Sequence, residues 1–496
     1  MLLRSTLLFL PAQIVGPMFQ LISVVVWTHI VGESTLGVIT LVTATHELLQ
    51  TVFLFWWSQY ALRFFGTVKD GEQADRFYRT ENTVLLLSVA AQSIAVLIVL
   101  RTKIAPDAGL ALVLATVAYV VTRSYTLYIA ERARVRHEVG VYSIQQVTGP
   151  ALGFLLGLLL LRLFGEGPEW PIAGYAVAQF AAVLAALPLI RFGWKVWPVD
   201  RATLSQALHY GLPLVVGGGL SWISINASRF IVSDMLGVAA AGLFAVGYGL
   251  GYRAATVAAM MVTASAFPLA VRTMAERGIE RAMGQLADNG ALLAAILFPS
   301  VAGVFMLRYE IVQLLIAPAF QSATLAILPL AALAGAIRNF RAHFVDQVFL
   351  LHRRTRILAC INAVEALLTV TASILFISQW GIVGSVVASV TATAAAAAIS
   401  FLVGMIVFRL RPPVLHLIKI AVATGVMMIV LYAVPKNATA LSLALHIVLG
   451  GATYTVVLAT LYGASLKRLW RRRTPIGSRQ KPVAAIADHA GGHSQA

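Results

Sequence analysis

About fourteen apolar stretches, each long enough to cross a lipid bilayer, follow one another along this 496-residue chain. The hydrocarbon core of a bilayer is about 30 Å thick, and a helix needs roughly 20 apolar residues to cross it. Inside lipid, each backbone N–H and C=O must be paired within its own segment, so these stretches are predicted to be helices. The predicted spans are 7–31, 36–62, 82–100, 109–129, 140–161, 171–190, 211–235, 238–270, 287–307, 322–350, 357–378, 381–408, 415–435 and 441–465.

The composition supports this interpretation. Hydrophobic residues make up 59% of the chain and charged residues only 11%, whereas a soluble domain carries roughly 25% charged residues. These proportions exclude a soluble enzyme and a disordered scaffold, and the single cysteine, Cys360, excludes an internal disulfide. The first stretch follows Arg4 as in a signal peptide, but Gln13 and Gln20 interrupt it and no cleavage site follows. We therefore predict an all-α polytopic membrane protein that retains its first helix.

The basic residues are distributed unevenly between the two sides of the predicted membrane. Of the 37 Lys and Arg residues, 26 fall in segments on the side of the amino terminus and five in loops on the opposite side. Because basic loops stay in the cytoplasm, this distribution predicts that both termini are cytoplasmic, and it accounts for most of the net charge of +17. The basic tail, residues 466–496, is predicted to be disordered and to contact lipid headgroups rather than nucleic acid.

Three short motifs recur along the chain at offsets between 205 and 212 residues. VGESTLG at 31–37 is echoed by LGVAAAG at 236–242, IAP at 104–106 recurs at 316–318, and W-x-I-x-G-x-x-V-A at 170–178 recurs at 380–388. Because each copy holds six spans, both copies enter the membrane from the same side, which predicts two lobes related by an axis along the membrane normal. The predicted units are a six-helix lobe at 1–200, a second at 201–412, two more helices at 413–465, and the tail.

Five arginines lie inside the predicted spans, where an ionisable side chain costs at least about 2.5–3.5 kcal/mol. Arg338 and Arg341 share one helical face, and Arg123 and Arg338 follow the two IAP turns at similar distances. Arginine stays charged when buried, and its planar fork binds phosphate, so these residues predict a site for an anionic, phosphorylated substrate. Pairing with acidic residues or extension to the headgroups is the alternative. The predicted substrate-binding residues are Arg123, Arg229, Arg253, Arg338 and Arg341.

Acidic residues are fewer in the spans, and only Glu47 lies in the middle of a span on a polar stripe. That stripe contains Thr40, Thr43, Thr51 and Ser58. The position of Glu47 predicts a coupling or gating role, with a structural hydrogen bond as the alternative. The predicted polar lining of the central cavity consists of Glu47, Gln13, Gln20, Asn226 and Asp346.

The motifs that could suggest catalysis are better explained by helix packing. GYGLGYR at 247–253 imitates a nucleotide-binding glycine loop, yet it lies within a span without a flanking strand. Its glycines at 247 and 251 instead predict close helix packing. The sequence contains no Walker lysine, metal-ligand cluster or nucleophile elbow. We therefore predict that the chain is not an enzyme and uses no cofactor or metal.

The segment YGLPLVVGGGLSWISINASRFIVSDMLGVAAAGLFAVGYGLGYR, from Tyr210 to Arg253, resembles the polysaccharide transporters of the multidrug/oligosaccharidyl-lipid/polysaccharide exporter superfamily. The family pattern begins Y-G-x-P-L, continues with Asp-Arg-Phe, and ends with L-G and A-x-G-x-(Y/F)-x-V. In this sequence Ser228-Arg229 stands where the pattern has Asp-Arg, so the arginine carries over and the acid does not. Fourteen helices in two lobes of six plus two extra are also similar to the family, over most of the chain.

The resemblance implies a flippase that moves polyprenyl-diphosphate-linked oligosaccharides across a bacterial inner membrane for exopolysaccharide, O-antigen or capsule synthesis. It also implies membrane lipids as partners, H⁺ or Na⁺ as candidate coupling ions, and a polysaccharide polymerase and co-polymerase as candidate partners. Alternatives are a lipid II flippase, a multidrug/cation antiporter of the same superfamily, and a non-transporting scaffold of a polysaccharide synthesis complex. A major facilitator carrier also has six plus six helices, but residues 63–77 lack the G-x-x-x-D-R-x-G-R-R-like signature of that class.

Overall fold

The computed structural model describes residues 2–64, 71–190 and 195–463, with side chains for all of these except 2–14, 17, 261 and 263–265. Within these ranges the chain forms α-helices and two π-helical turns, and no β-strand. The elements are α1 Leu2–Ile30, α2 Glu33–Phe53, α3 Phe55–Phe64, α4 Glu72–Val99, η2 Leu100–Ile104, α5 Leu110–Val135, α6 Val139–Phe164, α7 Glu169–Ala186, α8 Arg201–Leu236, α9 Val238–Leu315, α10 Pro318–Phe340, η3 Arg341–Val345, α11 Asp346–Leu351, α12 Thr355–Phe408, α13 Val414–Ala433 and α14 Ala440–Leu461.

These helices confirm the prediction of about fourteen spans in an all-α membrane protein. The helices α2 and α3 form one span with a break at Leu54, and α10, η3 and α11 form another. In contrast, α9 and α12 each contain two spans, because the backbone reverses at Gly278 (φ 79°) and Gly381 (φ 56°). Both glycines adopt positive φ, which residues with a Cβ rarely tolerate. Among the described residues, ten helical segments are long and apolar enough to cross a membrane, with the two halves of α12 counted together.

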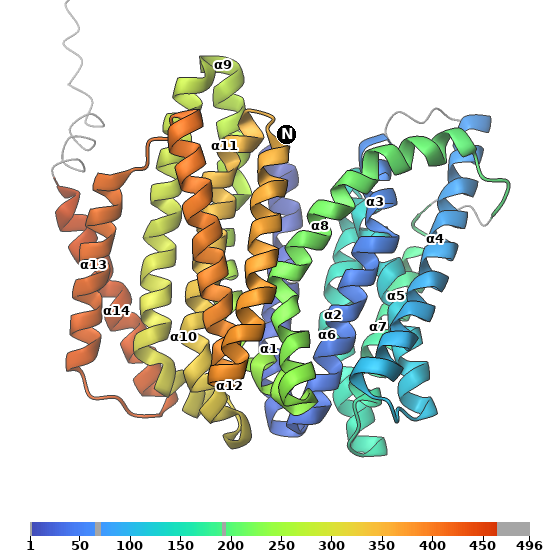
Figure 1. Cartoon of the computed structure of the whole chain (residues 1–496), viewed down its shortest axis with the longest axis horizontal. Helices are drawn as coiled ribbons and strands as arrows, with labels where there is room; N and C mark the ends of the chain where they lie inside the picture. Colours follow the sequence, from blue (N-terminus) through green and yellow to red (C-terminus); the bar gives the residue numbers. More distant parts are fainter. Residues whose placement is uncertain (1, 65–70, 191–194, 464–496) are drawn as a thin grey trace, which may run out of the picture.

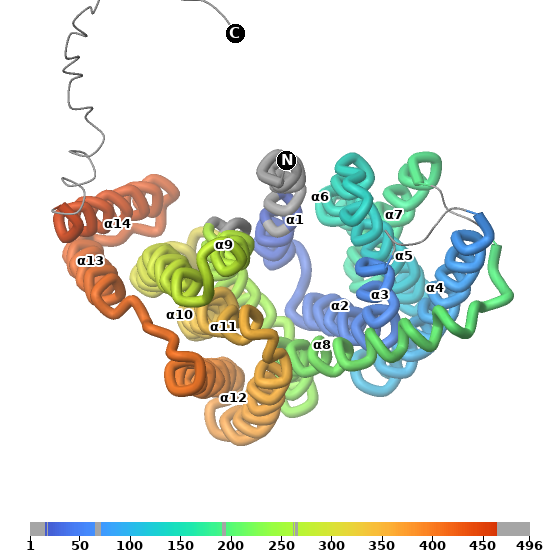
Figure 2. Tube along the Cα trace, turned by 90° about the horizontal axis from the view of Figure 1, so that it is seen from above, coloured from blue at the N-terminus to red at the C-terminus, as the bar shows by residue number. Residues whose placement is uncertain are grey.

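The helices form two lobes with α8 between them (Figures 1 and 2). The elements from α2 to α7 make up one lobe, and those from α9 to α12 make up the other. The long helix α8 runs diagonally across, and α13 and α14 lie at the outer edge of the second lobe. The basic tail that was predicted at 466–496 lies outside the described residues.

The first recurring motif marks a reciprocal contact between the lobes. A Cβ added to Gly37 of α2 would come within 2.1 Å of the carbonyl oxygen of Val238, at the start of α9. A Cβ added to Gly242 of α9 would come within 2.1 Å of the carbonyl oxygen of Glu33, at the start of α2. Both pairs of positions are related by the same offset of 205 residues. The two helices therefore meet through equivalent residues, as expected for lobes related by a twofold axis.

The third recurring motif, W-x-I-x-G-x-x-V-A, supplies a glycine for close helix packing in each lobe. Its shared glycine is Gly174 in α7 and Gly384 in α12. A Cβ on Gly174 would come within 2.3 Å of the backbone nitrogen of Gly157, and one on Gly384 within 2.0 Å of the carbonyl oxygen of Phe376. Only glycine allows the fifth and sixth spans of either lobe to approach this closely.

Candidate functional site

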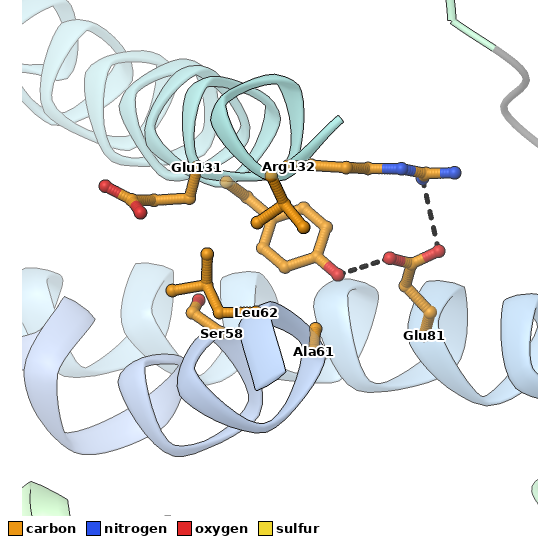
Figure 3. A pocket seen from close by; sticks show the side chains of 8 residues that line it. Ser58, Ala61, Leu62, Glu81, Glu131 and Arg132 are labelled. Atoms are coloured by element: carbon orange, nitrogen blue, oxygen red, sulfur yellow. Dashed lines mark hydrogen bonds and ion pairs between the residues drawn. The ribbon is translucent and has the colours of Figure 1, made fainter. Parts of the chain in front are cut away.

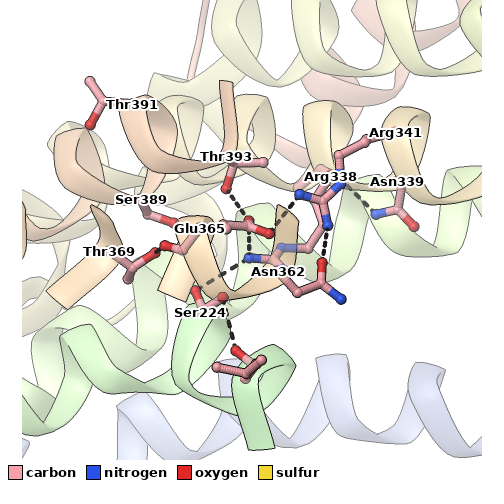
Figure 4. A network of polar contacts seen from close by, with 12 residues as sticks. Ser224, Arg338, Asn339, Arg341, Asn362, Glu365, Thr369, Ser389, Thr391 and Thr393 are labelled. Atoms are coloured by element: carbon pink, nitrogen blue, oxygen red, sulfur yellow. Dashed lines mark hydrogen bonds and ion pairs between the residues drawn. The ribbon is translucent and has the colours of Figure 1, made fainter. Parts of the chain in front are cut away.

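Two of the five predicted substrate-binding arginines lie in a buried ion-pair network in the second lobe (Figure 4). Arg338 Nη2 lies 2.5 Å from Glu365 Oε1, and Arg341 Nη1 lies 2.7 Å from Glu365 Oε2. The Nε atom of Arg341 lies 3.1 Å from Asp346 Oδ2. These four residues are at most 8% exposed, and Glu365 is completely buried.

Neutral side chains complete this network. Asn362 accepts a hydrogen bond of 2.8 Å from Arg341, and Thr393 donates one of 3.1 Å to Glu365. Ser400 donates one of 2.9 Å to Asp346. Two guanidinium groups therefore face two carboxylates, so the formal charge of the network is zero. Arg338, Arg341 and Asp346 have partners within the protein, which is the arrangement expected of structural residues.

The other three predicted arginines, Arg123, Arg229 and Arg253, have a different environment, and we call them the central arginines. Arg229 Nη1 donates to the carbonyl oxygen of Thr40 at 3.4 Å, and Arg253 Nη1 to that of Gln20 at 3.4 Å. Both are long hydrogen bonds; the first joins α8 to α2, and the second joins α9 to α1. The Nε of Arg229 is buried and has no hydrogen-bond partner among the described residues.

The central arginines lack ion pairs with the acids that the structure describes. Glu47 acts electrostatically on Arg229 and Arg253 over a longer range, and Arg123 acts on Tyr119 and His46. Arg229 and Arg253 therefore share one acidic neighbour, which leaves an excess of positive charge where α8 and α9 face α1 and α2. An anionic ligand would balance this excess.

The polar stripe of α2 supplies hydrogen-bond acceptors beside these charges. Thr40, Thr43 and Thr51 each donate their hydroxyl proton to a carbonyl of the same helix, at 2.8 to 3.0 Å. Their oxygen lone pairs can still accept hydrogen bonds, for example from sugar hydroxyl groups. The side chain of Glu47 is exposed on this helix.

The remaining predicted lining residues have mixed environments. Asn226 is 5% exposed, in the part of α8 that packs between the lobes. Gln20 contributes its carbonyl oxygen to Arg253, whereas the side chain of Gln13 lies outside the described residues. Ser228, where the family pattern has an acid, is buried and hydrogen-bonds to Ser373 of α12 at 2.9 Å.

The structure also contains a buried polar network that the sequence did not indicate (Figure 3). Tyr128 donates a hydrogen bond to Glu81, and Arg132 Nη1 lies 3.2 Å from the other oxygen of that carboxylate. Trp57 Nε1 donates to the hydroxyl of Tyr128 at 3.1 Å. Glu81 and Arg132 lie just outside the predicted spans 82–100 and 109–129, because hydropathy detects only the apolar part of each helix. The network joins α3, α4 and α5 and has no excess charge.

No set of three or more His, Cys, Asp or Glu side chains is placed to hold a metal ion in the described ranges. The glycine-rich segment 247–253 packs against α10 instead of forming a loop. A Cβ on Gly247 would come within 2.9 Å of Ile327, and one on Gly251 within 2.5 Å of the carbonyl oxygen of Leu328. This close approach agrees with the predicted packing role.

Residues 2–274, more than half of the chain, match the family of polysaccharide biosynthesis proteins. Among solved structures, the lipid II flippase MurJ in an inward closed conformation is similar with a TM-score of 0.74 and 13% identity, over 93% of this chain and 100% of MurJ. An inward-facing multidrug resistance MATE transporter of the MOP superfamily is similar with a TM-score of 0.65 and 14% identity, over 80% and 94%.

An outward-facing MATE transporter of the same superfamily gives a TM-score of 0.55 at 15% identity, over 82% of this chain and 94% of that one. At these identities the structures establish the fold: the chain adopts the two-lobed helical fold of these transporters. No curated protein sequence matches the chain.

Proposed function

Because this chain belongs to the polysaccharide biosynthesis protein family, we propose that it is a flippase that moves a polyprenyl-diphosphate-linked oligosaccharide across the membrane by alternating access. The proposed location is the bacterial inner membrane with both termini in the cytoplasm, in agreement with the 26 basic residues on that side.

The observation that carries this proposal is the set of central arginines. They lie within the membrane, and the acids described in the structure do not neutralise them by ion pairs. A guanidinium group held away from water gains most from a ligand that offers two acceptor oxygens, such as a phosphate. A diphosphate would occupy Arg229 and Arg253 at once, and the oxygens of the α2 stripe would accept hydrogen bonds from the attached sugars. The polyprenyl chain can remain in the surrounding lipid.

Two other functions within this fold remain as candidates. Lipid II is the substrate in the name of the similar MurJ structure, and it also carries a diphosphate. A flippase for lipid II would therefore need the same central arginines. A multidrug antiporter for cationic substrates is disfavoured, because two arginines beside one glutamate would repel such a substrate.

We expect the purified full chain, reconstituted in vesicles, to move a fluorescent polyprenyl-diphosphate oligosaccharide between leaflets. The fraction of label accessible to an impermeant quencher measures the movement. Parallel vesicles contain labelled lipid II or enclose a cationic dye, and empty vesicles provide the background rate. Movement of lipid II alone would reassign the substrate, and movement of the cation alone would contradict the proposal.

Glu47 is proposed as the coupling or gating acid, because it acts on two central arginines and remains exposed. We expect Glu47→Gln to lower the dependence of transport on a proton or sodium gradient by about tenfold, a typical size for coupling between sites. Glu33→Gln, on the same helix at its end, is the matched control. If transport by Glu47→Gln follows both gradients as the wild type does, Glu47 has no coupling role.

A further inference from the structure

A second concentration of positive charge lies at the end of the second lobe, away from the central arginines. It surrounds a cavity of about 1210 Å³, which we call the basic pocket. Three segments line it: residues 279–287 of α9, residues 352–357 at the start of α12, and residues 407–411 at the end of α12. Its arginines are Arg281, Arg353, Arg354, Arg356, Arg409 and Arg411, and Glu280 is the only acid in its lining.

These arginines are available to a ligand. All six are exposed, and none of them makes a side-chain hydrogen bond or ion pair with the part of the chain that the structure describes. A basic loop on the cytoplasmic side needs only to carry charge, and its side chains are free to spread apart in water. Here six guanidinium groups line one concavity instead, which is the arrangement of a binding site for several acceptor oxygens.

The backbone holds these segments in place. Arg353 and Arg409 adopt left-handed conformations, with φ of 56° and 55°, which residues with a Cβ adopt only when their surroundings require it. The N–H of Arg354 donates to Phe349 at 2.8 Å, and that of Leu410 donates to Gly404 at 2.9 Å. Leu410 is 3% exposed, so its side chain anchors the second turn in the core of the lobe. The convergence of the arginines is therefore built into two fixed turns.

The surface beside the pocket is apolar and exposed. Val407, which lines the pocket, is 62% exposed, and the neighbouring Ile406 is 77% exposed. After the turn, Val414 and Leu415 at the start of α13 are 55% and 64% exposed. Figure 2 shows the link between α12 and α13 at the outer edge of the lobe. A hydrocarbon chain can therefore lie against this edge while a charged group occupies the pocket.

We propose that the basic pocket binds the phosphate headgroup of an anionic phospholipid from the leaflet that meets the basic face of the protein. Arginine-lined pockets at the cytoplasmic ends of transmembrane helices suit such headgroups. The cavity is larger than a single phosphate needs, so it has room for the glycerol backbone as well. The N-terminus of α12, which begins at Thr355 without a side-chain cap, adds a positive helix dipole. This site is separate from the central arginines and does not depend on the proposed transport function.

Binding of phosphatidylglycerol to the full chain in a neutral detergent tests this proposal, with native mass spectrometry and the melting temperature as readouts. We expect phosphatidylglycerol to remain bound and to raise the melting temperature, and phosphatidylcholine to do neither. The triple variant Arg354→Gln, Arg356→Gln, Arg411→Gln should bind phosphatidylglycerol about a hundredfold more weakly. It avoids the two left-handed arginines, so the turns are retained.

The matched control is the triple variant Arg76→Gln, Arg134→Gln, Arg272→Gln. It removes the same charge from exposed helical ion pairs that contribute little to stability. An equal loss of binding in this control would show attraction by net charge alone and would overturn the proposal. Two further ligands distinguish other sources of phosphate. The proposal is also overturned if the pocket binds soluble pyrophosphate in preference to phosphatidylglycerol. It is overturned too if the protein retains a polyprenyl diphosphate but no phosphatidylglycerol.

Discussion

Replacing Arg253 or Arg229 by alanine is expected to lower the rate of transport by about 10- to 100-fold while the protein stays abundant in the membrane. Each arginine would lose charge-assisted hydrogen bonds to the substrate, worth about 1.5–3 kcal/mol, and 1.4 kcal/mol corresponds to a factor of ten. Neither arginine forms an ion pair with an acid that the structure describes, so the substitution breaks no buried pair of the kind that Glu365 makes. The rate is measured in vesicles, and the amount of protein by immunoblotting of the membrane fraction.

Lysine at the same positions separates charge from geometry. Arg229→Lys and Arg253→Lys keep the positive charge but lose the planar fork, so we expect partial transport. Arg123→Ala should behave like the other alanine variants, since Arg123 also forms no ion pair with a described acid. Normal rates in all three alanine variants, at wild-type abundance, would show that the central arginines do not hold the substrate.

Replacing Glu365 by leucine is expected to destabilise the protein by about 3–5 kcal/mol, the cost of removing one partner from a buried ion pair. Glu365 is the shared partner of Arg338 and Arg341, and without it Asp346 is the one described carboxylate that remains paired with either guanidinium group. The expected result is a low yield of folded protein in the membrane and a lower melting temperature in detergent. Size-exclusion chromatography measures the yield of folded protein, and a thermal melt measures the melting temperature.

A second substitution distinguishes structure from substrate binding at this network. The double variant Glu365→Leu, Arg338→Leu leaves Arg341 paired with Asp346, so it should recover much of the lost stability. Arg338→Ala alone leaves Glu365 paired with Arg341, so we expect a smaller loss of protein than in Glu365→Leu. If Arg338→Ala is as abundant as the wild type but does not transport, Arg338 contacts the substrate as the sequence predicted.

The spans could be predicted from the sequence because each contains its own signal, a run of apolar residues of the length of a bilayer. The repeat was also visible, since glycines such as Gly37 and Gly174 recur wherever two backbones must approach closely. Because the apolar runs define the spans, the sequence also showed that the five arginines lie within them.

The partners of these arginines could not be predicted, because pairing between helices depends on their rotation and distance. Arg338 and Arg341 lie on one helical face, as expected, but only the fold shows that both reach Glu365 of α12. Arg229 and Arg253 also have apolar neighbours in sequence, yet the hydrogen bonds that they donate to described residues go to carbonyl oxygens of α2 and α1. Distinguishing a neutralised arginine from an available one therefore required the tertiary structure.

The reciprocal contact of Gly37 with Val238 and of Gly242 with Glu33 has a consequence for the history of the chain. A contact in which each half offers the same surface to the other is the interface of a homodimer, here within one polypeptide. A six-helix ancestor could pair with itself through this surface before its gene was duplicated and fused. Fusion fixes one copy of each half, so the two halves are free to diverge. In the described residues one half has Arg123 without an ion pair, and the other has Arg338 neutralised by Glu365.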